Sequence, residues 1–155
     1  MLKLTKKADY GLIALKHLAN AGSGSSASAK EIADAYRLPL PLLAKVLQRL
    51  TKSGLLRSVP GTNGGYLLSR DPRRISALEV IRAIDGPVLL TSCFTSTGGS
   101  CDQSDLCTVR EPLRKVHEAI LQMLATMSIS DISKDEPRES GGACATEPAQ
   151  TLLVL

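Results

Sequence analysis

The stretch from Pro41 to Ser69, PLLAKVLQRLTKSGLLRSVPGTNGGYLLS, decides the fold. Its first part has helical periodicity, with apolar residues three and four positions apart and cationic residues on the opposite face. Gly54 is expected to end this helix, because glycine tolerates the positive φ common at helix C-termini. Two short aliphatic runs follow, separated by the turn-rich segment 60–65. The stretch therefore predicts a helix over 41–53 and then a β-hairpin with a glycine-rich tip.

Two further helices are predicted before this stretch. Ser28 and Glu31 have the spacing of a capping box, and the helix that they open would run to about Tyr36. Periodicity also predicts a helix over 5–19. Three helices followed by a hairpin form a winged helix-turn-helix, so the expected fold class is mainly α with a small β-hairpin. The predicted buried face of the first helix consists of Ala8, Leu12, Leu15 and Ala19.

The second half of the chain adds two predicted helices. Ser76 and Glu79 repeat the capping-box pattern, and the helix that they open would run to Asp85, where Gly86 ends it. A long helix is predicted over 112–128, with apolar residues close to a heptad seam. Such a seam fits either a dimerisation helix or a helix packed within its own subunit. The seam consists of Leu113, Val116, Ile120, Leu124 and Met127.

Charge is unevenly distributed along the chain of 155 residues. The net charge is +4, but residues 1–75 carry 13 Lys and Arg against 4 Asp and Glu, a balance of +9, whereas residues 76–155 carry 6 against 11, a balance of −5. A basic half is typical of a protein that binds a polyanion, although a solvated basic surface would explain the charge equally well. Aromatic residues make up only 3% of the chain, which argues against base stacking on aromatic platforms.

Other classes of function are disfavoured. No apolar run approaches the roughly 18 residues of a membrane span, and no long apolar stretch follows the N-terminal lysines as in a secretory signal. We therefore expect a cytoplasmic protein without a membrane partner. The sequence shows no nucleophile–base pair, phosphate-binding loop or paired carboxylates, so we do not expect an enzyme.

The helix over 41–53 is the predicted DNA-reading element, because a helix fits the major groove and one of its faces is polar and cationic. That face could equally be the solvated side of an amphipathic helix, but the helix order, the capping and the glycine-rich wing together favour double-stranded DNA. Tyr66 is expected to anchor the hairpin rather than touch DNA. The candidate DNA-contacting residues are Lys6, Lys7, Pro41, Lys45, Gln48, Arg49, Lys52, Gly61, Thr62, Asn63 and Gly64.

Three cysteines, Cys93, Cys101 and Cys107, lie in one predicted loop. Thiolates on a flexible loop can converge on a soft metal centre, and three of them leave room for a fourth ligand from elsewhere. A structural zinc, a regulatory disulfide and ordinary free thiols remain open, although zinc sites usually contain closely spaced cysteine pairs. Cys144, in a polar segment, is interpreted as an uninvolved thiol.

Several of these motifs resemble the Rrf-type winged-helix regulators, a family that includes IscR and NsrR. The resemblance spans about residues 1–132 and lies in the opening LTKKADYG (4–11), the wing GTNGGY (61–66) and the three-cysteine loop. The segment GPVLLTSC (86–93), with CTVR (107–110), is most similar to the branch that regulates the SUF iron–sulfur assembly operon.

The resemblance implies a homodimer held by the long C-terminal helix. It also implies an iron–sulfur cluster, either 2Fe–2S or 4Fe–4S, bound by the three loop cysteines, whose state alters DNA affinity. Arg110 stands where IscR has its histidine ligand, and arginine cannot ligate a metal. Asp9 matches the NsrR aspartate that the partner subunit contributes as fourth ligand, although an acid in a first helical turn also complements the helix dipole. His117 and Glu111 are weaker candidates for this ligand.

The reading motifs also depart from the family, so no operator sequence can be transferred. Pro60 replaces an arginine before the wing, and Ala44 replaces a glutamate of the reading helix. We expect a DNA-binding domain over 1–75, a cluster loop with dimerisation helices over 76–132, and a disordered tail over 133–155. The expected function is repression of iron–sulfur assembly genes. A nitric-oxide or redox sensor with the same ligands, or a DNA-binding module with a structural zinc, is the alternative.

Overall fold

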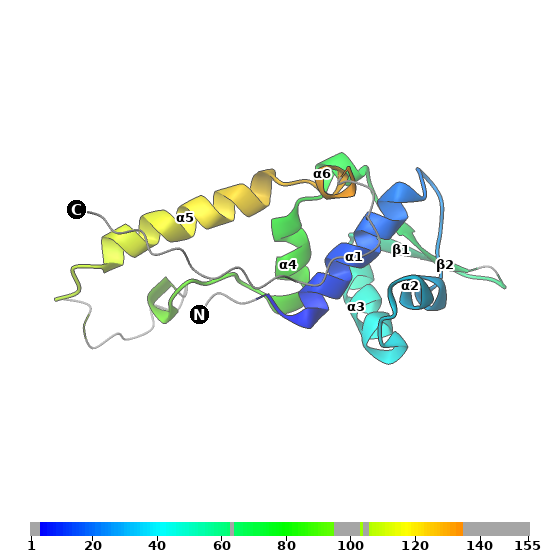
Figure 1. The fold of residues 1–155 in the computed structure, drawn as a ribbon, viewed down its shortest axis with the longest axis horizontal. Coiled ribbons are helices and arrows are strands. Elements are labelled where there is room, and N and C mark those ends of the chain that lie inside the picture. The colour runs from blue at the N-terminus through cyan, green and yellow to red at the C-terminus, as the bar shows by residue number, and fades with distance from the viewer. Residues whose placement is uncertain (1–3, 63, 95–102, 104–105, 135–155) are drawn as a thin grey trace, which may run out of the picture.

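The computed structural model describes residues 4–62, 64–94, 103 and 106–134. These residues form a mainly helical fold with one two-stranded antiparallel hairpin, as the sequence predicts (Figure 1). No helix among them is both long and apolar enough to cross a membrane. The elements are α1 (Lys6–Asn20), α2 (Ala29–Tyr36), α3 (Leu40–Lys52), β1 (Leu56–Val59), β2 (Gly65–Leu68), η1 (Pro72–Arg74), α4 (Ala77–Asp85), η2 (Ser92–Phe94), α5 (Arg110–Thr126) and α6 (Ile129–Ser133).

Helix starts follow the capping residues in the sequence. Both predicted capping boxes are confirmed, since the backbone N–H of Glu31 donates to Ser28 Oγ at 3.1 Å and that of Glu79 donates to Ser76 Oγ at 3.2 Å. The carboxylates accept the reciprocal bonds from the cap residues. At Glu31, the backbone bond and then the hydroxyl bond from Ser28 lower the pKa of the carboxyl. Local chemistry therefore sets where these helices begin.

The core forms around α1, which packs against α3, α4 and α6. The face predicted for α1 is partly wrong: Leu12 and Ala19 are only half-buried. Three helices pack on α1, so its buried surface is wider than the single apolar face that periodicity predicts. The α1 residues that are buried are Ala8, Gly11, Ala14, Leu15 and Leu18.

The hairpin is joined by a third backbone segment that sequence reasoning did not predict. Leu56 pairs with Leu68 and Val59 pairs with Gly65 along the two strands. Ala27 adds an antiparallel bridge to Tyr66, whose N–H donates to Ala27 O at 2.8 Å while the N–H of Ala27 donates to Tyr66 O at 3.0 Å. This bridge ties the wing to the segment before α2.

The last helix, α6, was also not predicted. Ser128 and Asp131 form a third capping box, a signal that is present in the sequence. Ile129 is fully buried in the core, and its N–H donates to Ile75 O at 2.9 Å. The predicted tail from residue 133 is therefore wrong at its start, because Ser133 ends this helix. The rest of the tail, 135–155, lies outside the described residues.

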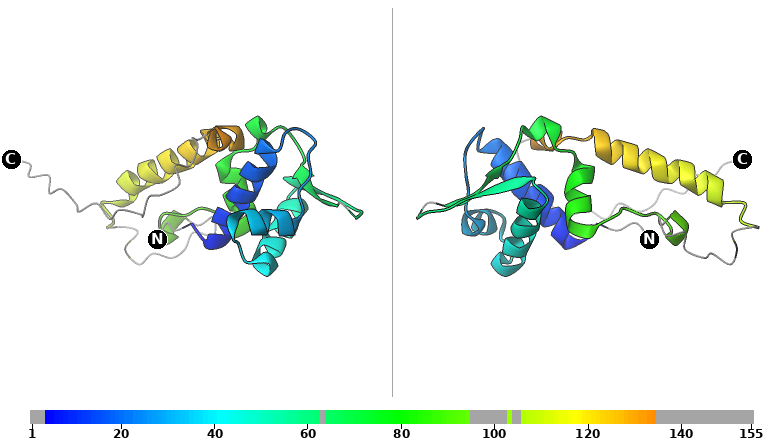
Figure 2. Two further views of the ribbon diagram at one scale, coloured as in Figure 1. Left: turned by 45° about the vertical axis from the view of Figure 1, so that its right-hand side comes forward. Right: turned by 180° about the vertical axis from the view of Figure 1, so that it is seen from behind.

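The long helix α5 begins and ends two residues before its predicted bounds. Its C-terminal half contacts α4, and the helix extends away from the hairpin (Figures 1 and 2). Leu121 and Leu124 pack against a small cluster that includes Leu78 and Ile81 of α4. Packing within its own subunit is thus confirmed for one edge of α5, yet no α5 residue is fully buried.

Gly11 lets α1 approach α4 closely, and its replacement tests this contact. A Cβ atom at this position would collide with Ile84 Cδ1. We expect Gly11→Val to lower the free energy of unfolding by about 1–3 kcal/mol, measured by denaturant unfolding at fixed protein concentration. Ile84→Val removes the colliding methyl group and should recover part of this loss.

The exposed position Ala35 supplies the control, since Ala35→Val should change stability by only about 0.5 kcal/mol. An unchanged cost of Gly11→Val in the Ile84→Val background would show that this contact does not set the approach of the helices.

Candidate DNA-binding face and cysteine site

Helix α3 separates into a buried face and an exposed face, as its periodicity predicts. Four apolar side chains face the core, and the polar and cationic side chains face outward. Pro41 lies in the first turn, where its missing N–H costs no hydrogen bond, and is exposed. The buried residues are Leu43, Val46, Leu47 and Leu50, and the exposed ones are Lys45, Gln48, Arg49 and Lys52.

A tight helix end places the hairpin beside α3. Gly54 has φ +78°, and its N–H donates to Thr51 O at 3.0 Å. The N–H of Leu55 donates to Leu50 O at 3.0 Å, which completes a Schellman motif. The chain therefore reverses into β1 within residues 53–55, so only a short turn separates the reading helix from the wing.

A shallow cavity of about 230 Å³ lies between α3 and the wing. Gln48, Thr51 and Lys52 line it from α3, and Ser58 and Tyr66 line it from the strands. The backbone of Tyr66 is tied to Ala27, whereas the role of its side chain stays a prediction. Its position in the cavity, which sequence reasoning missed, also places a phenol next to the exposed face of α3. Hydroxyl, amide and ammonium groups of this kind are those that contact a phosphate backbone.

The wing tip is a tight turn that depends on glycine. The N–H of Gly64 donates to Gly61 O at 2.9 Å, and a Cβ atom at Gly64 would lie 2.8 Å from the same oxygen. Gly61 has φ +125°, a conformation that side chains disfavour. Gly61 and Thr62 are exposed, whereas Asn63 lies outside the described residues. Bare backbone at the tip can approach a duplex closely.

Arg49, a predicted DNA contact, also forms a hydrogen bond within the protein. Its Nη1 donates to Ile84 O, in the last turn of α4, at 2.6 Å. At least one guanidinium N–H group is therefore committed to the protein itself. Lys6 and Lys7 are exposed in the first turn of α1. Contact of any of these residues with DNA stays a prediction.

Cys93 and Cys107, two of the three predicted ligands, are free thiols in the described part of the chain, and both are half-buried. Cys93 Sγ lies 2.9 Å from Thr91 Oγ1. Cys101 and Cys144 lie outside the described residues. The segment with Cys93 and the start of α5, just after Cys107, lie at the end of the molecule opposite the wing (Figure 1).

An aromatic contact fixes the Cys93 segment against α5. The rings of Phe94 and His117 stack with centroids 5.1 Å apart and an interplanar angle of 25°. The predicted cysteine loop is therefore packed against α5 at its first end. Pro87, Val88 and Leu121 line a cavity of about 240 Å³ beside this stack.

The candidates for a fourth ligand are spread over the molecule. Asp9 is exposed in the first turn of α1. Glu111 is paired with Arg114, which donates from Nε at 2.9 Å, and this hydrogen bond lowers the pKa of Glu111. Among the described residues, no three His, Cys, Asp or Glu side chains lie close enough together to hold a metal ion. Within the described part of one chain, Asp9 therefore does not lie close enough to Cys93 and Cys107 to bind a metal ion together with them.

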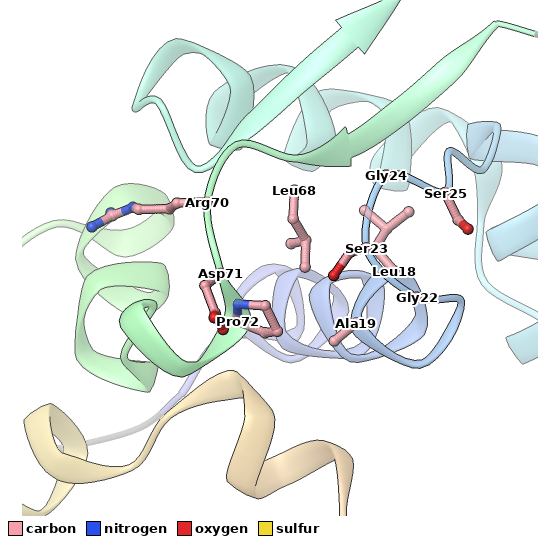
Figure 3. A pocket seen from close by; sticks show the side chains of 10 residues that line it. All are labelled: Leu18, Ala19, Gly22, Ser23, Gly24, Ser25, Leu68, Arg70, Asp71 and Pro72. Atoms are coloured by element: carbon pink, nitrogen blue, oxygen red, sulfur yellow. The ribbon is translucent and has the colours of Figure 1, made fainter.

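A pocket of about 230 Å³ at the base of the hairpin is not a comparable site (Figure 3). Its charged groups are already engaged in the fold. Arg70 points away from the pocket and pairs with Glu79 at 2.8 Å, and Asp71 accepts the N–H of Arg73. The pocket is lined by Leu18, Ala19, Gly22, Ser23, Gly24, Ser25, Leu68, Arg70, Asp71 and Pro72.

Comparison with known proteins places this geometry in a family. The Rrf2 family model, described as an iron-dependent transcriptional regulator, matches residues 4–135. The chain is 31% identical to the HTH-type transcriptional regulator NsrR of Shouchella clausii, over 87% of the chain and 91% of that protein. It is 33% identical to the HTH-type transcriptional regulator IscR of Xenorhabdus nematophila, over 87% of the chain and 81% of that protein.

A solved structure shows the same architecture. CymR, the global cysteine regulator of Bacillus subtilis, superposes with a TM-score of 0.72 at 27% identity, over 86% of this chain and 97% of that one. The three helices, the wing and the long helix α5 are thus a shared arrangement. The chain belongs to the Rrf2 family of DNA-binding, winged-helix transcriptional regulators.

Proposed function

We propose that the chain is a homodimeric repressor whose promoter affinity depends on an iron–sulfur cluster held by Cys93, Cys101 and Cys107. The observation that carries the proposal is the packing of the cysteine segment. The Phe94–His117 stack holds its first end on α5, and its second end leads directly into the same helix. Two half-buried thiols therefore flank one segment that has both ends on a single helix.

The donor set suits such a cluster. Thiolates are the usual ligands of iron–sulfur clusters, and hydrogen bonds to sulfur tune them. The hydroxyl of Thr91 lies within hydrogen-bond distance of Cys93 Sγ and can supply such a bond. When bound, the cluster would supply a centre that responds to oxidants and nitric oxide. The type of cluster, 2Fe–2S or 4Fe–4S, depends on the remaining ligand.

Asp9 is the proposed fourth ligand, contributed by the partner subunit. The resemblance to NsrR implies this role, and two observations support it. Its side chain is exposed on α1, and it does not form a ligand group with Cys93 and Cys107 in the described part of its own chain. A second copy of the chain is the arrangement that would bring this carboxylate to the cysteines.

The apolar surface of α5 supports the dimer. The exposed fractions are 49% for Val116, 67% for Met123 and 46% for Met127, although all three are apolar. Several large apolar side chains exposed along one helix are typical of a protein interface. Leu124 of α5 packs on α4, the helix that leads into the cysteine segment. A partner subunit bound to α5 would therefore be connected to α4 through this contact.

Promoter recognition is assigned to α3 and the wing. Lys45, Gln48 and Lys52 would enter the major groove, and the backbone of the wing tip would contact the flanking phosphates. Two-fold symmetry would place the half-sites about one helical turn apart. The regulated genes are proposed to be those of iron–sulfur assembly. Sensing of nitric oxide or redox state by the same ligands is the second candidate, favoured by the similarity to proteins named NsrR.

Anaerobic purification tests the cluster. We expect the full-length protein to be brown and to contain iron and acid-labile sulfide, because three thiolates converge on the metal. Replacement of Cys93, Cys101 or Cys107 by Ala should abolish the visible absorbance, and Asp9→Ala should change the spectrum or make the cluster labile. Cys144→Ala is the control and should leave the spectrum unchanged. A colourless protein that contains zinc, or an unaltered spectrum in Cys101→Ala, would contradict the proposal.

Salt titration tests the DNA face. Each lost phosphate contact should reduce the slope of log K against log salt by about 0.9. We therefore expect Lys45→Gln and Lys52→Gln to weaken binding to a duplex selected from a random pool by the wild-type protein, and at least one of them to flatten its salt dependence. Lys134→Gln, directly after α6, is the matched control and should bind like wild type. Equal affinity and slope in all three variants would exclude this face.

A further inference from the structure

The last turn of α4 is a junction of three segments. From α3, Arg49 Nη1 donates to Ile84 O at 2.6 Å. From the start of α1, Thr5 Oγ1 donates to Asp85 Oδ1 at 2.7 Å. Directly after this turn, Gly86 has φ +84° and redirects the chain into the segment that carries the first cysteine. One helical turn thus contacts the reading helix, the helix with Asp9 and the cysteine segment.

The bond from Arg49 has the chemistry of a helix cap. Carbonyl oxygens in the last turn of a helix have no intrahelical donor, and a cation there complements the negative end of the helix dipole. The bond is charge-assisted and lies in a partly buried position, so it resists replacement by water. Displacement of the α4 end therefore displaces the guanidinium as well.

We infer that Arg49 is a positioning residue that couples the state of the cysteine segment to the orientation of the reading helix. This inference rests on the proposed function, because it describes how the same site is regulated. Movement of the segment after Gly86 shifts the carbonyl of Ile84, and Arg49 transmits the shift to α3. Thr5 joins the start of α1 to the same turn of α4. The segment with Cys93 and the helix with Asp9 are therefore both connected to this turn.

A phosphate contact by Arg49 is the competing role, and salt dependence separates the two. If Arg49 only contacts a phosphate, Arg49→Gln weakens binding equally in every state of the cysteine segment and lowers the salt slope by about 0.9. If Arg49 positions the helix, the salt slope stays unchanged and the response to the cysteine segment is lost.

A double-mutant cycle with Cys93→Ala measures this coupling. The dissociation constant for the selected duplex is determined anaerobically by fluorescence anisotropy on the full chain. We expect Cys93→Ala to change it by about fivefold or more in the wild-type background. In the Arg49→Gln background, we expect a change of less than about twofold. The matched cycle with Lys45→Gln, on the exposed face of the same helix, should retain the full response to Cys93→Ala.

The conservative variant and hydrogen exchange guard against a merely structural effect. Arg49→Lys keeps a cation that can donate to one carbonyl, so it should recover part of the response. Faster amide exchange at 86–90 is expected in Arg49→Gln and not in Lys45→Gln. Additive effects of Arg49→Gln and Cys93→Ala, or no effect of Cys93→Ala on affinity, would overturn the inference. The iron and sulfide content of the same samples tests the proposed cluster separately from the role of Arg49.

Discussion

The close packing of α1 against α3 and α4 is the constraint on which the rest of the structure depends. Gly11 lets α1 meet Ile84 of α4, and Val46 of α3 packs at the same point. This contact fixes the angle between the reading helix and the helix that leads to the cysteines. A larger residue at position 11 would meet the Ile84 side chain and disturb this packing.

Two sites at opposite ends of one small protein are joined through this packing. The wing and the exposed face of α3 lie at one end, and the segment with Cys93 and the start of α5 lie at the other (Figure 1). Between them, α4 contacts α1, α3 and α5. Packed contacts of this kind can carry a change at one end of a protein to the other, provided that the change favours one arrangement of the helices.

The anchoring of α5 and α6 bears on how a dimer would act. The N–H of Ala77 donates to Met127 O, and the N–H of Ile129 donates to Ile75 O, so the end of α5 is bonded to the start of α4. Ile129 is fully buried against the core. The long helix is therefore attached firmly at one end, while its other end follows the cysteine segment. A partner subunit packed on α5 would be held at a defined angle to the core.

The sequence alone determined the helices with local signals, the hairpin and the two faces of α3, because capping boxes, glycine turns and apolar periodicity act over a few residues. Ser28, Ser76 and Gly54 each act as predicted. The cap that Arg49 places on α4 and the pairing of Tyr66 with Ala27 had no local signal. Contacts between residues 35 to 80 positions apart, such as Arg49 with Ile84 and Thr5 with Asp85, depend on how the helices pack. Only the tertiary structure decides them, because no short-range pattern encodes the distance between two helices.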